Sequence, residues 1–329
     1  MILQFSINDI DLVYKSLTNL IIHKGKYMKK IILAILSALV ILSLTACSQN
    51  ETNEASKPLK QQENKVFKIG AIPDQNATDI AKNMEAIAKY IGEQTKLDVE
   101  FVPSVDYAAL VTAFERGEIQ LAWFGGLTGV QARAVSPGSE AIAQRPMDAK
   151  FKSVFIAQKD LNITSLEEIK GKTFTFGSES STSGSLMPRY FLTQAGIDAE
   201  NNLNGKPNYS GSHDKTIKLV ESGAFQTGAL NIQVWESLNE QNKVDLSKVK
   251  VFYTTPEYFD YHWTINSLDN VDKIYGEGTK AKVKEALLNI NETNQPEIMK
   301  FFKADKFIET NNENYKAIEE VGKSLGMVK

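Results

Sequence analysis

A run of hydroxyl side chains occupies residues 177–184, where the sequence reads Gly-Ser-Glu-Ser-Ser-Thr-Ser-Gly. The run follows a strand-like segment and precedes a helix-like one. Ser181, Thr182 and Ser183, together with the free backbone N–H groups of a helix start, can donate several hydrogen bonds to one anion. A loop that only caps the helix explains the same residues equally well. No Gly-Lys-Ser/Thr follows the run, which argues against a nucleotide-binding P-loop.

Two further segments carry side chains that could contact an anion. His213 lies at a second strand-to-helix junction, where its imidazole could donate a hydrogen bond. Asp214, the next residue, could cap the helix and favour the charged imidazole. Tyr107 begins a predicted helix behind Asp106, a candidate N-cap, and could direct its hydroxyl into a cleft. The simpler interpretations are a capped helix start for His213 and core packing for Tyr107.

An aromatic stretch at residues 255–263 reads Thr-Pro-Glu-Tyr-Phe-Asp-Tyr-His-Trp and places Asp260 near a presumed hinge. Packing between two lobes is the simpler interpretation of this stretch. A hydrolase would need a serine nucleophile with His213 as its base, and the candidates are Ser181, Ser183 and Ser212. None of these serines is the centre of a Gly-x-Ser-x-Gly motif, and the chain has only three His. The sequence therefore predicts no catalytic residue, no metal site and no cofactor.

The elements that must position these residues alternate along the chain. Strand-like apolar runs lie at 67–73, 98–102, 121–124, 153–157, 173–176, 228–230 and 249–253. Helix-like amphipathic segments lie at 77–94, 107–115, 186–194, 215–221 and 280–289. This alternation predicts an α/β fold with mixed parallel sheets and helices on both faces.

The same pattern predicts two lobes joined by a hinge. We place the two connections at residues 158–160 and 254–260. The first lobe then consists of residues 66–158 and 259–329, and the second lobe of residues 159–258. A ligand would bind in the cleft between the lobes, where helix N-termini face the carboxyl ends of strands.

The N-terminal residues resemble an export signal instead of mature structure. Lys29 and Lys30 precede an apolar run at 31–42, which is shorter than the roughly 20 residues that span a bilayer. We predict that residues 28–46 are a signal peptide and that residues 1–27 are an upstream extension from a misplaced start codon. Polar residues 47–65 form a flexible tether. A permanent membrane anchor is the alternative.

Leu44-Thr45-Ala46-Cys47 resembles the lipobox of bacterial lipoproteins. In a lipobox the cysteine sulfur receives a diacylglyceryl group and the signal is cut just before that cysteine. Cys47 is the only cysteine of the chain, so it makes no intramolecular disulfide. The resemblance implies a protein anchored by lipidated Cys47 on the extracytoplasmic face of the membrane; a free cysteine inside the signal is the alternative.

The charge balance excludes a broad nucleic-acid-binding surface. The chain has 37 Lys and Arg against 40 Asp and Glu, a formal net charge of −3. Removal of residues 1–46 leaves 32 basic and 38 acidic residues. An anion must therefore be bound by local geometry, because the overall charge repels it.

Taken together, these motifs resemble those of periplasmic phosphonate/phosphite-binding proteins of ABC transporters. The segments that carry the resemblance are Phe67–Gly70, Asp106–Val111, Leu121–Gly125, Ser181–Gly184, Gly211–Asp214 and Thr255–Pro256. The resemblance covers residues 66–329 and implies a type II periplasmic-binding-protein fold that closes on a tetrahedral oxyanion. Relatives that take up phosphate or selenate are similar.

The resemblance also implies a ligand shell. Its members are Tyr107, Ser181, Thr182, Ser183, His213 and Asp260. Asp260 lies where organophosphonate binders place a carboxylate against the ligand's amino group. This sequence departs from that pattern at Phe151, where a tyrosine is expected, and near Val234, where a second acid is expected. An incomplete amine cage favours a compact oxyanion, since an unpaired buried ammonium is costly.

The sequence thus predicts a monomeric solute-binding lipoprotein of an ABC importer. It would capture phosphite, phosphonate, phosphate or a selenate-like oxyanion and deliver the ion to a permease and its ATPase. Two alternatives remain open: a hydrolase that uses a Ser/His pair in the same cleft, and an oxyanion-sensing lipoprotein without a transport role.

Overall fold

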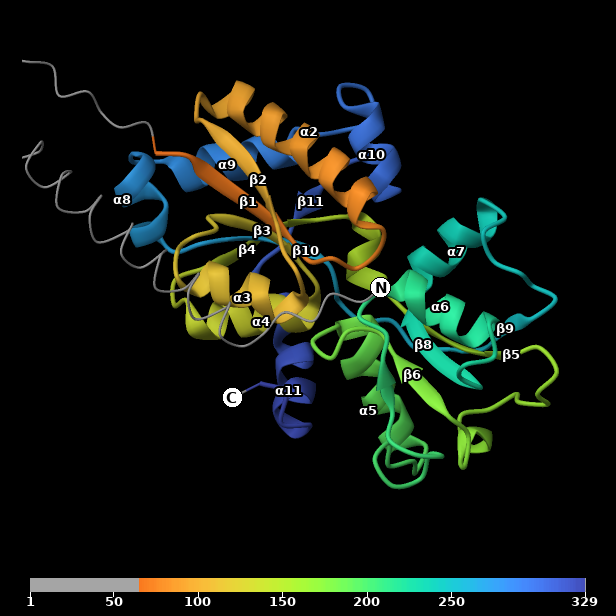
Figure 1. The fold of residues 1–329 in the computed structure, drawn as a ribbon. Coiled ribbons are helices and arrows are strands. Elements are labelled where there is room, and N and C mark those ends of the chain that lie inside the picture. The colour runs from red at the N-terminus through yellow and green to blue at the C-terminus, as the bar shows by residue number, and fades with distance from the viewer. Residues whose placement is uncertain (1–64, 329) are drawn as a thin grey trace, which may run out of the picture. The chain divides into compact units, whose positions relative to one another are not determined.

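The computed structural model describes residues 65–328, and these residues form two β-sheets with helices around them (Figure 1). Within them, the first sheet has the strand order β11-β4-β10-β3-β1-β2, with bounds β1 Phe67–Ala71, β2 Val99–Pro103, β3 Leu121–Phe124, β4 Glu140–Gln144, β10 His262–Ile265 and β11 Ile308–Glu309. The second has the order β7-β6-β8-β5-β9, with bounds β5 Ser153–Gln158, β6 Phe174–Phe176, β7 Asn208–Tyr209, β8 Thr227–Asn231 and β9 Val249–Thr254.

Both sheets combine parallel and antiparallel pairs. In the six-stranded sheet, β1 runs parallel to β2 and β3, whereas β10 runs antiparallel to β3 and β4. In the five-stranded sheet, β6 runs parallel to β7 and β8, whereas β5 runs antiparallel to β8 and β9. Parallel neighbours need crossover connections, usually helices. The predicted α/β class with mixed sheets is therefore confirmed.

Helices cover both sheets. In the first and last thirds of the described chain they are α2 Ala77–Thr95, α3 Tyr107–Glu115, α4 Gly126–Val135, α8 Asp272–Tyr275, α9 Thr279–Leu288, α10 Pro296–Phe302 and α11 Lys316–Ser324. Between these lie α5 Met187–Gln194, α6 His213–Glu221 and α7 Ile232–Glu240, with short helical turns η1 Pro146–Lys150 and η3 Thr182–Leu186. In Figure 1, α2 and α9 lie on one side of the six-stranded sheet, and α3 and α4 lie on the other.

Local sequence explains where the first helices begin and end. The Asn76 side chain accepts hydrogen bonds from the backbone N–H groups of Thr78 and Asp79, which caps α2. The Asp106 side chain caps α3 in the same way through the N–H of Ala109. Gly117 follows α3 with φ +69°, a left-handed conformation that glycine adopts without strain. The N-cap at Asp106 fixes Tyr107 as the first residue of α3.

The first connection between the sheets differs from the prediction. Strand β5 belongs to the five-stranded sheet, where it pairs with β8 and β9, so the chain crosses at residues 145–152 and not at 158–160. An apolar run marks β5 as a buried strand, but periodicity does not say which sheet the strand joins. The return connection covers residues 255–261, between β9 and β10.

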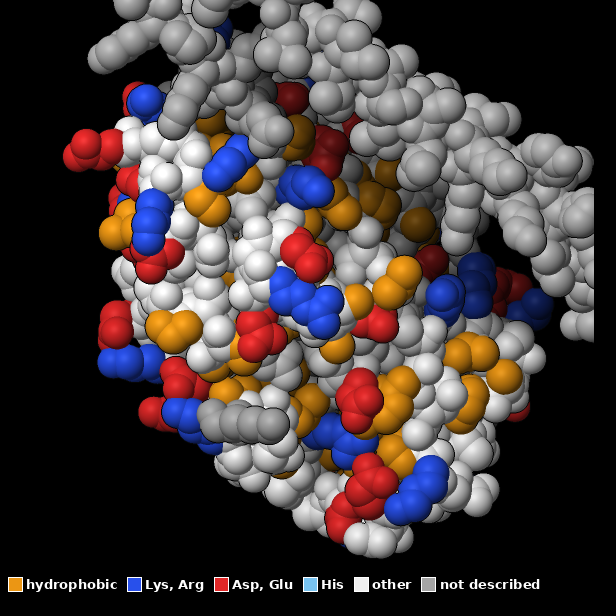
Figure 2. All heavy atoms as spheres, turned by 60° about the vertical axis from the view of Figure 1, so that its left-hand side comes forward, with side chains coloured by type: hydrophobic (Ala, Val, Ile, Leu, Met, Phe, Trp, Pro, Cys, Tyr) orange, Lys and Arg blue, Asp and Glu red, His pale blue; other side chains and the backbone are white. Residues whose placement is uncertain are grey.

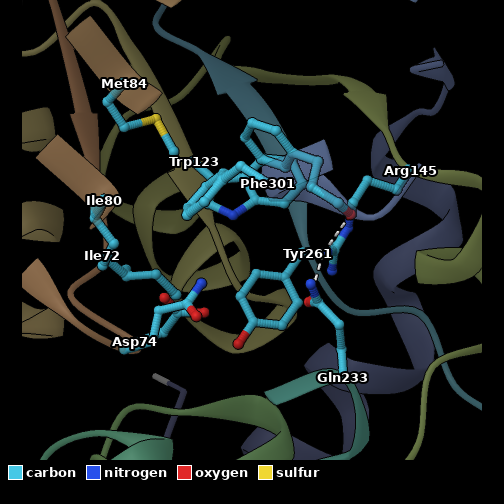
Figure 3. Close-up of a pocket in the computed structure, with 11 residues that line it drawn as sticks. Ile72, Asp74, Ile80, Met84, Trp123, Arg145, Gln233, Tyr261 and Phe301 are labelled. Atoms are coloured by element: carbon cyan, nitrogen blue, oxygen red, sulfur yellow. Dashed lines mark hydrogen bonds between the residues drawn. The ribbon is translucent and has the colours of Figure 1, made fainter. Parts of the chain in front are cut away.

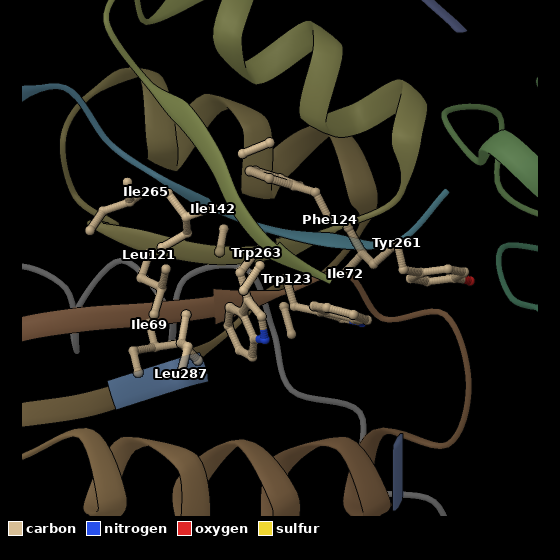
Figure 4. Close-up of a cluster of buried hydrophobic side chains, with 14 of the residues drawn as sticks. Ile69, Ile72, Leu121, Trp123, Phe124, Ile142, Tyr261, Trp263, Ile265 and Leu287 are labelled. Atoms are coloured by element: carbon tan, nitrogen blue, oxygen red, sulfur yellow. The ribbon is translucent and has the colours of Figure 1, made fainter. Parts of the chain in front are cut away.

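Aromatic side chains extend the core of the six-stranded sheet towards the return connection. Trp123 of β3 packs against Trp263 of β10, with ring centroids 5.3 Å apart (Figure 4). The Tyr261 ring also stacks on Trp123, with ring centroids 5.8 Å apart. The rigid core therefore fixes the position of Tyr261, a residue of the connection.

The predicted extension, signal peptide, lipidated Cys47 and tether lie outside the described residues, except Lys65. Between residues 65 and 328, the helices are too short or too polar for any of them to span a membrane. On the face shown in Figure 2, basic and acidic side chains are interspersed. The described residues that are visible there form no continuous basic patch.

Candidate functional site

The six side chains predicted to contact the ligand are all buried, and each exposes at most 2% of its surface. Tyr107 opens α3; Ser181 caps η3; Thr182 and Ser183 form its first turn; His213 opens α6. Asp260 lies in the connection between β9 and β10. Burial raises the pKa of Tyr107 well above its usual value, and nearby Asp74 and Asp260 raise it further. The structure thus brings hydroxyls, imidazole and carboxylate from distant segments together.

Three polar atoms of this cluster have no hydrogen-bond partner among residues 65–328. They are the Tyr107 hydroxyl, Ser183 Oγ and Asp260 Oδ2. A buried polar group without a partner costs about 1–3 kcal/mol, so native proteins contain few of them. Three such groups in one buried cluster make it the candidate site for a polar ligand.

The N-terminus of α4 is already covered by protein acceptors. The backbone N–H of Gly126 donates to Asp260 Oδ1 at 2.9 Å, and that of Leu127 donates to Thr182 Oγ1 at 2.8 Å. A Cβ at Gly125 would lie 3.1 Å from Thr182 Oγ1 and 3.2 Å from Asp260 Oδ1, so glycine permits this close approach. These two N–H groups of α4 are therefore already paired, whereas the Tyr107 and Ser183 hydroxyls are not paired among residues 65–328.

The imidazole of His213 is neutral, which corrects the predicted charged ring. The Asn231 N–H donates to Nδ1 at 3.3 Å, so the proton is on Nε2, 3.2 Å from the Tyr261 hydroxyl. Burial lowers the pKa of His213 to about 4. Asp214 is not the cap either: Ser212 is the N-cap residue, and its hydroxyl donates to the Asp214 carboxylate at 2.6 Å.

Asp74 also lies at this cluster, although it belongs to none of the sequence motifs. Its carbonyl oxygen accepts a hydrogen bond from the His213 N–H at 2.9 Å, which joins the loop after β1 to α6. Burial raises the pKa of the Asp74 carboxyl to about 6, against a hydrogen bond from Tyr261 that lowers it. The sequence signal for Asp74 is its position just after strand β1, because the carboxyl ends of parallel strands lie at one edge of a sheet, where ligands bind.

A second buried polar cluster lies beside Tyr261 and contains Arg145 and Gln233 (Figure 3). Arg145 binds Asp148 through two hydrogen bonds, from Nε at 2.7 Å and from Nη2 at 2.6 Å. Its Nη1 donates to Gln233 Oε1 at 2.6 Å, and its guanidinium lies 5.2 Å from the centre of the Tyr261 ring. Between this cluster and Asp74 lies a cavity of about 10 Å³, room for about one water molecule.

A chain of hydrogen bonds fixes the backbone at Asp260. The Nδ1–H of His262 donates to the Asp260 carbonyl oxygen at 2.9 Å, and Arg133 Nη1 donates to His262 Nε2 at 2.7 Å. Burial and the charge of Arg133 hold the pKa of His262 well below its usual value. His262 therefore serves as a neutral positioning residue.

Comparison with known proteins identifies what this arrangement serves. The family model described as the periplasmic substrate-binding protein of phosphonate ABC transporters matches residues 69–315. The chain belongs to this family. Its members bind substrate for ABC importers outside the cytoplasm, and this chain accordingly has a substrate-binding role in import.

One relative within the family and its solved structure illustrate the match. A probable phosphite-binding protein of Prochlorococcus marinus, PhnD1, is 44% identical over 273 residues, 80% of this chain and 91% of that protein. The solved structure of PhnD1 in complex with methylphosphonate has a TM-score of 0.77 at 43% identity, with 80% of this chain and 99% of that chain covered.

The fold extends to more distant structures. A phosphonate-transporter binding protein of Pseudomonas aeruginosa has a TM-score of 0.67 at 21% identity, with 78% of this chain and 85% of that chain covered. The predicted type II periplasmic-binding-protein fold is confirmed by these neighbours.

The hydrolase alternative has no support in the family or the geometry. Among the described residues, the ring nitrogens of His213 bond to Asn231 and Tyr261, not to a serine hydroxyl. The one Gly-x-Ser-x-Gly match of the chain, residues 322–326, lies at the end of α11, where exposed Ser324 donates to the Val321 carbonyl. A nucleophile elbow instead follows a strand.

Proposed function

We propose that this substrate-binding protein captures a small tetrahedral phosphorus oxyanion, with phosphite and methylphosphonate as the first candidates. The observation that carries the proposal is the group of unpartnered buried atoms, the Tyr107 hydroxyl, Ser183 Oγ and Asp260 Oδ2. The printed names of the 44% identical relative and its methylphosphonate complex support the same ligand class. The proposed ligand residues are Tyr107, Ser181, Thr182, Ser183, His213 and Asp260.

The walls of the site favour a ligand without an amino group. Phe151 is buried and packs edge-on against the rings of Tyr258 and Tyr261. Val234 is buried in the first turn of α7. An aminoalkyl phosphonate would bury its ammonium with Asp260 as the single remaining member of the amine cage, which is unfavourable.

Contacts between the segments around the two sheets support a closed arrangement that would retain a ligand. The hydrogen bond from His213 N–H to the Asp74 carbonyl and the bond from Leu127 N–H to Thr182 Oγ1 each join segments on different sides of the connections. We propose lobes of residues 65–144 with 262–328, and of residues 153–254, that open and close about the connections. The closed form would then deliver the ion to a permease and ATPase.

The remaining proposals concern attachment and activity. We propose a monomer without enzymatic activity, exported and anchored through lipid on Cys47. Incorporation of labelled palmitate into the wild type, and its loss in Cys47→Ala, would support the anchor; equal labelling of both would contradict it.

Calorimetric titration of the purified protein tests the ligand proposal. We expect phosphite and methylphosphonate to bind more tightly than 2-aminoethylphosphonate. At 100 times its dissociation constant, a ligand should also stabilise the fold by about 2.7 kcal/mol. No binding of any phosphorus oxyanion would overturn the proposal, and preference for the aminoalkyl compound would overturn the ligand class.

A further inference from the structure

Asp260 presents only one of its two carboxylate oxygens to the site. Oδ1 accepts a hydrogen bond from the Gly126 N–H at 2.9 Å. Oδ1 and Thr182 Oγ1 both lie close to Gly125, where a side chain would not fit without a shift. Oδ2 is buried and has no partner among residues 65–328. The hydroxyls of Thr182 and Ser183 lie near enough to this carboxyl to lower its pKa, against the effect of burial. A ligand oxygen held by these hydroxyls therefore meets a carboxylate oxygen that can only accept a hydrogen bond or carry a proton.

No free cation of the described chain faces this carboxylate. Arg145, the cation nearest to the neighbouring acids, is bound by both oxygens of Asp148, and Arg133 donates to His262. His213 and His262 are neutral. The titratable and charged groups that face Asp260 or its immediate neighbours are Asp74, Tyr107, Arg133, Arg145, Asp148, His213, Asp214, Tyr258, Tyr261, His262 and Tyr315.

A fully ionised ligand would be unfavourable in these surroundings. Two negative groups that share a buried site cannot both stay ionised at little cost, and such pairs hold one proton between them. Burial already raises the pKa of Asp260 to about 7, and the charge of Asp148 contributes to the shift. Hydroxyl groups such as those of Ser181 and Thr182 can donate hydrogen bonds to an anion but supply no net charge.

We propose that Asp260 selects its ligand by a proton: Asp260 Oδ2 and one ligand oxygen share a single proton in a hydrogen bond, so the site accepts oxyanions that carry a proton near neutral pH. Phosphite, methylphosphonate and phosphate meet this condition. Sulfate and selenate do not, because they are fully ionised at neutral pH. The inference rests on the proposed function. It assigns Asp260 a role in sharing a proton with the ligand, in place of the amine-binding role that the resemblance to organophosphonate binders implies.

The proton count of binding tests this directly. At about pH 9, where ligand and Asp260 are both mostly ionised, methylphosphonate binding should take up about one proton per site, and affinity should fall roughly tenfold per further pH unit. Calorimetry in two buffers of different ionisation enthalpy measures the uptake. Sulfate and selenate should bind at least about tenfold more weakly than methylphosphonate, the threshold we set for selection.

Two variants of equal charge change separate the proton from general electrostatics. Asp260→Asn keeps an acceptor for the Gly126 N–H and presents an NH₂ donor in place of Oδ2. We expect it to bind methylphosphonate without proton uptake and to gain affinity for sulfate. Asp214→Asn removes the charge of the half-buried Asp214 side chain at the start of α6. This variant should keep the proton uptake of the wild type.

Methylphosphonate binding by the wild type without proton uptake would overturn the inference and leave the proposed function standing. Equal uptake in Asp260→Asn, or equal loss in Asp214→Asn, would also overturn it. Absence of binding by any phosphorus oxyanion would instead overturn the proposed function. If Asp260→Asn does not fold, the wild-type proton count and its rejection of sulfate still decide the matter.

Discussion

Two buried polar clusters lie near Tyr261 and differ in how fully their groups are paired. In the ligand cluster, the Tyr107 hydroxyl, Ser183 Oγ and Asp260 Oδ2 lack partners among the described residues. In the other cluster, Arg145 donates to Asp148, to Gln233 and to the Phe302 carbonyl. Both clusters are almost completely buried.

The difference separates structure from function. A saturated buried ion pair is at best weakly stabilising, but removal of one partner is very costly. An unsaturated cluster has the opposite property, because removal of an unpartnered group costs the fold little and takes a contact from the ligand. Burial alone therefore does not distinguish the two clusters, whereas the number of unpaired donors and acceptors in each cluster does.

The largest effect is expected in the saturated cluster. Arg145→Met leaves Asp148 buried without its partner and should lower the free energy of unfolding by about 3–5 kcal/mol, measured by denaturant titration. Lys273→Met, which breaks the exposed pair with Asp269, provides the control and should cost at most about 1 kcal/mol. If Arg145→Met is too unstable to purify, Arg145→Met combined with Asp148→Leu should recover most of the loss. Equal effects of Arg145→Met and Lys273→Met would contradict the comparison.

The second effect concerns pH and the unpaired carboxyl. Burial raises the pKa of Asp260 from 3.8 in the unfolded chain to about 7, so between these values the folded protein retains a proton that the unfolded chain has lost. The contribution of Asp260 to stability therefore falls as pH rises through this window. Without ligand, Asp260→Asn should gain stability over the wild type by about 1.4 kcal/mol per pH unit across the window, with a plateau above it.

Unfolding by denaturant at a series of pH values measures this difference. Asp214→Asn, which removes a half-buried carboxylate that accepts a hydrogen bond from Ser212, provides the charge-matched control. A stability gap for Asp260→Asn that is constant or shrinks with pH would show that Asp260 is not held in a proton-retaining environment.

The smallest effect should appear in binding alone. Ser183→Ala and Tyr107→Phe each remove one unpartnered hydroxyl, so each should weaken methylphosphonate binding by about 1.5–3 kcal/mol, at least tenfold, and leave stability unchanged. Thr182→Val should weaken both properties, because Thr182 Oγ1 also accepts the Leu127 N–H. Unchanged affinity in Ser183→Ala and Tyr107→Phe would place the anion elsewhere.

Much of the fold could be read from local patterns. The helix at 107–115 and the strand at 121–124 have the bounds that the sequence predicts, because a capping Asp106 and paired glycines at 125–126 mark their ends. The α/β class follows from the alternation of such elements. The crossing at 145–152 could not be read, since β5 looks the same whichever sheet it joins.

Residue type and spacing alone determined that hydroxyls and a histidine stand at strand-to-helix junctions of an α/β chain, and that a carboxylate stands in an aromatic stretch near the predicted hinge. Tertiary structure decided their chemistry: burial makes His213 a neutral donor, a backbone bond engages one oxygen of Asp260 and leaves the other unpaired, and Asp74 joins the site through Tyr261. Charge state and hydrogen-bond saturation depend on desolvation and on partners that are remote in the chain. A local pattern carries no information about either of them.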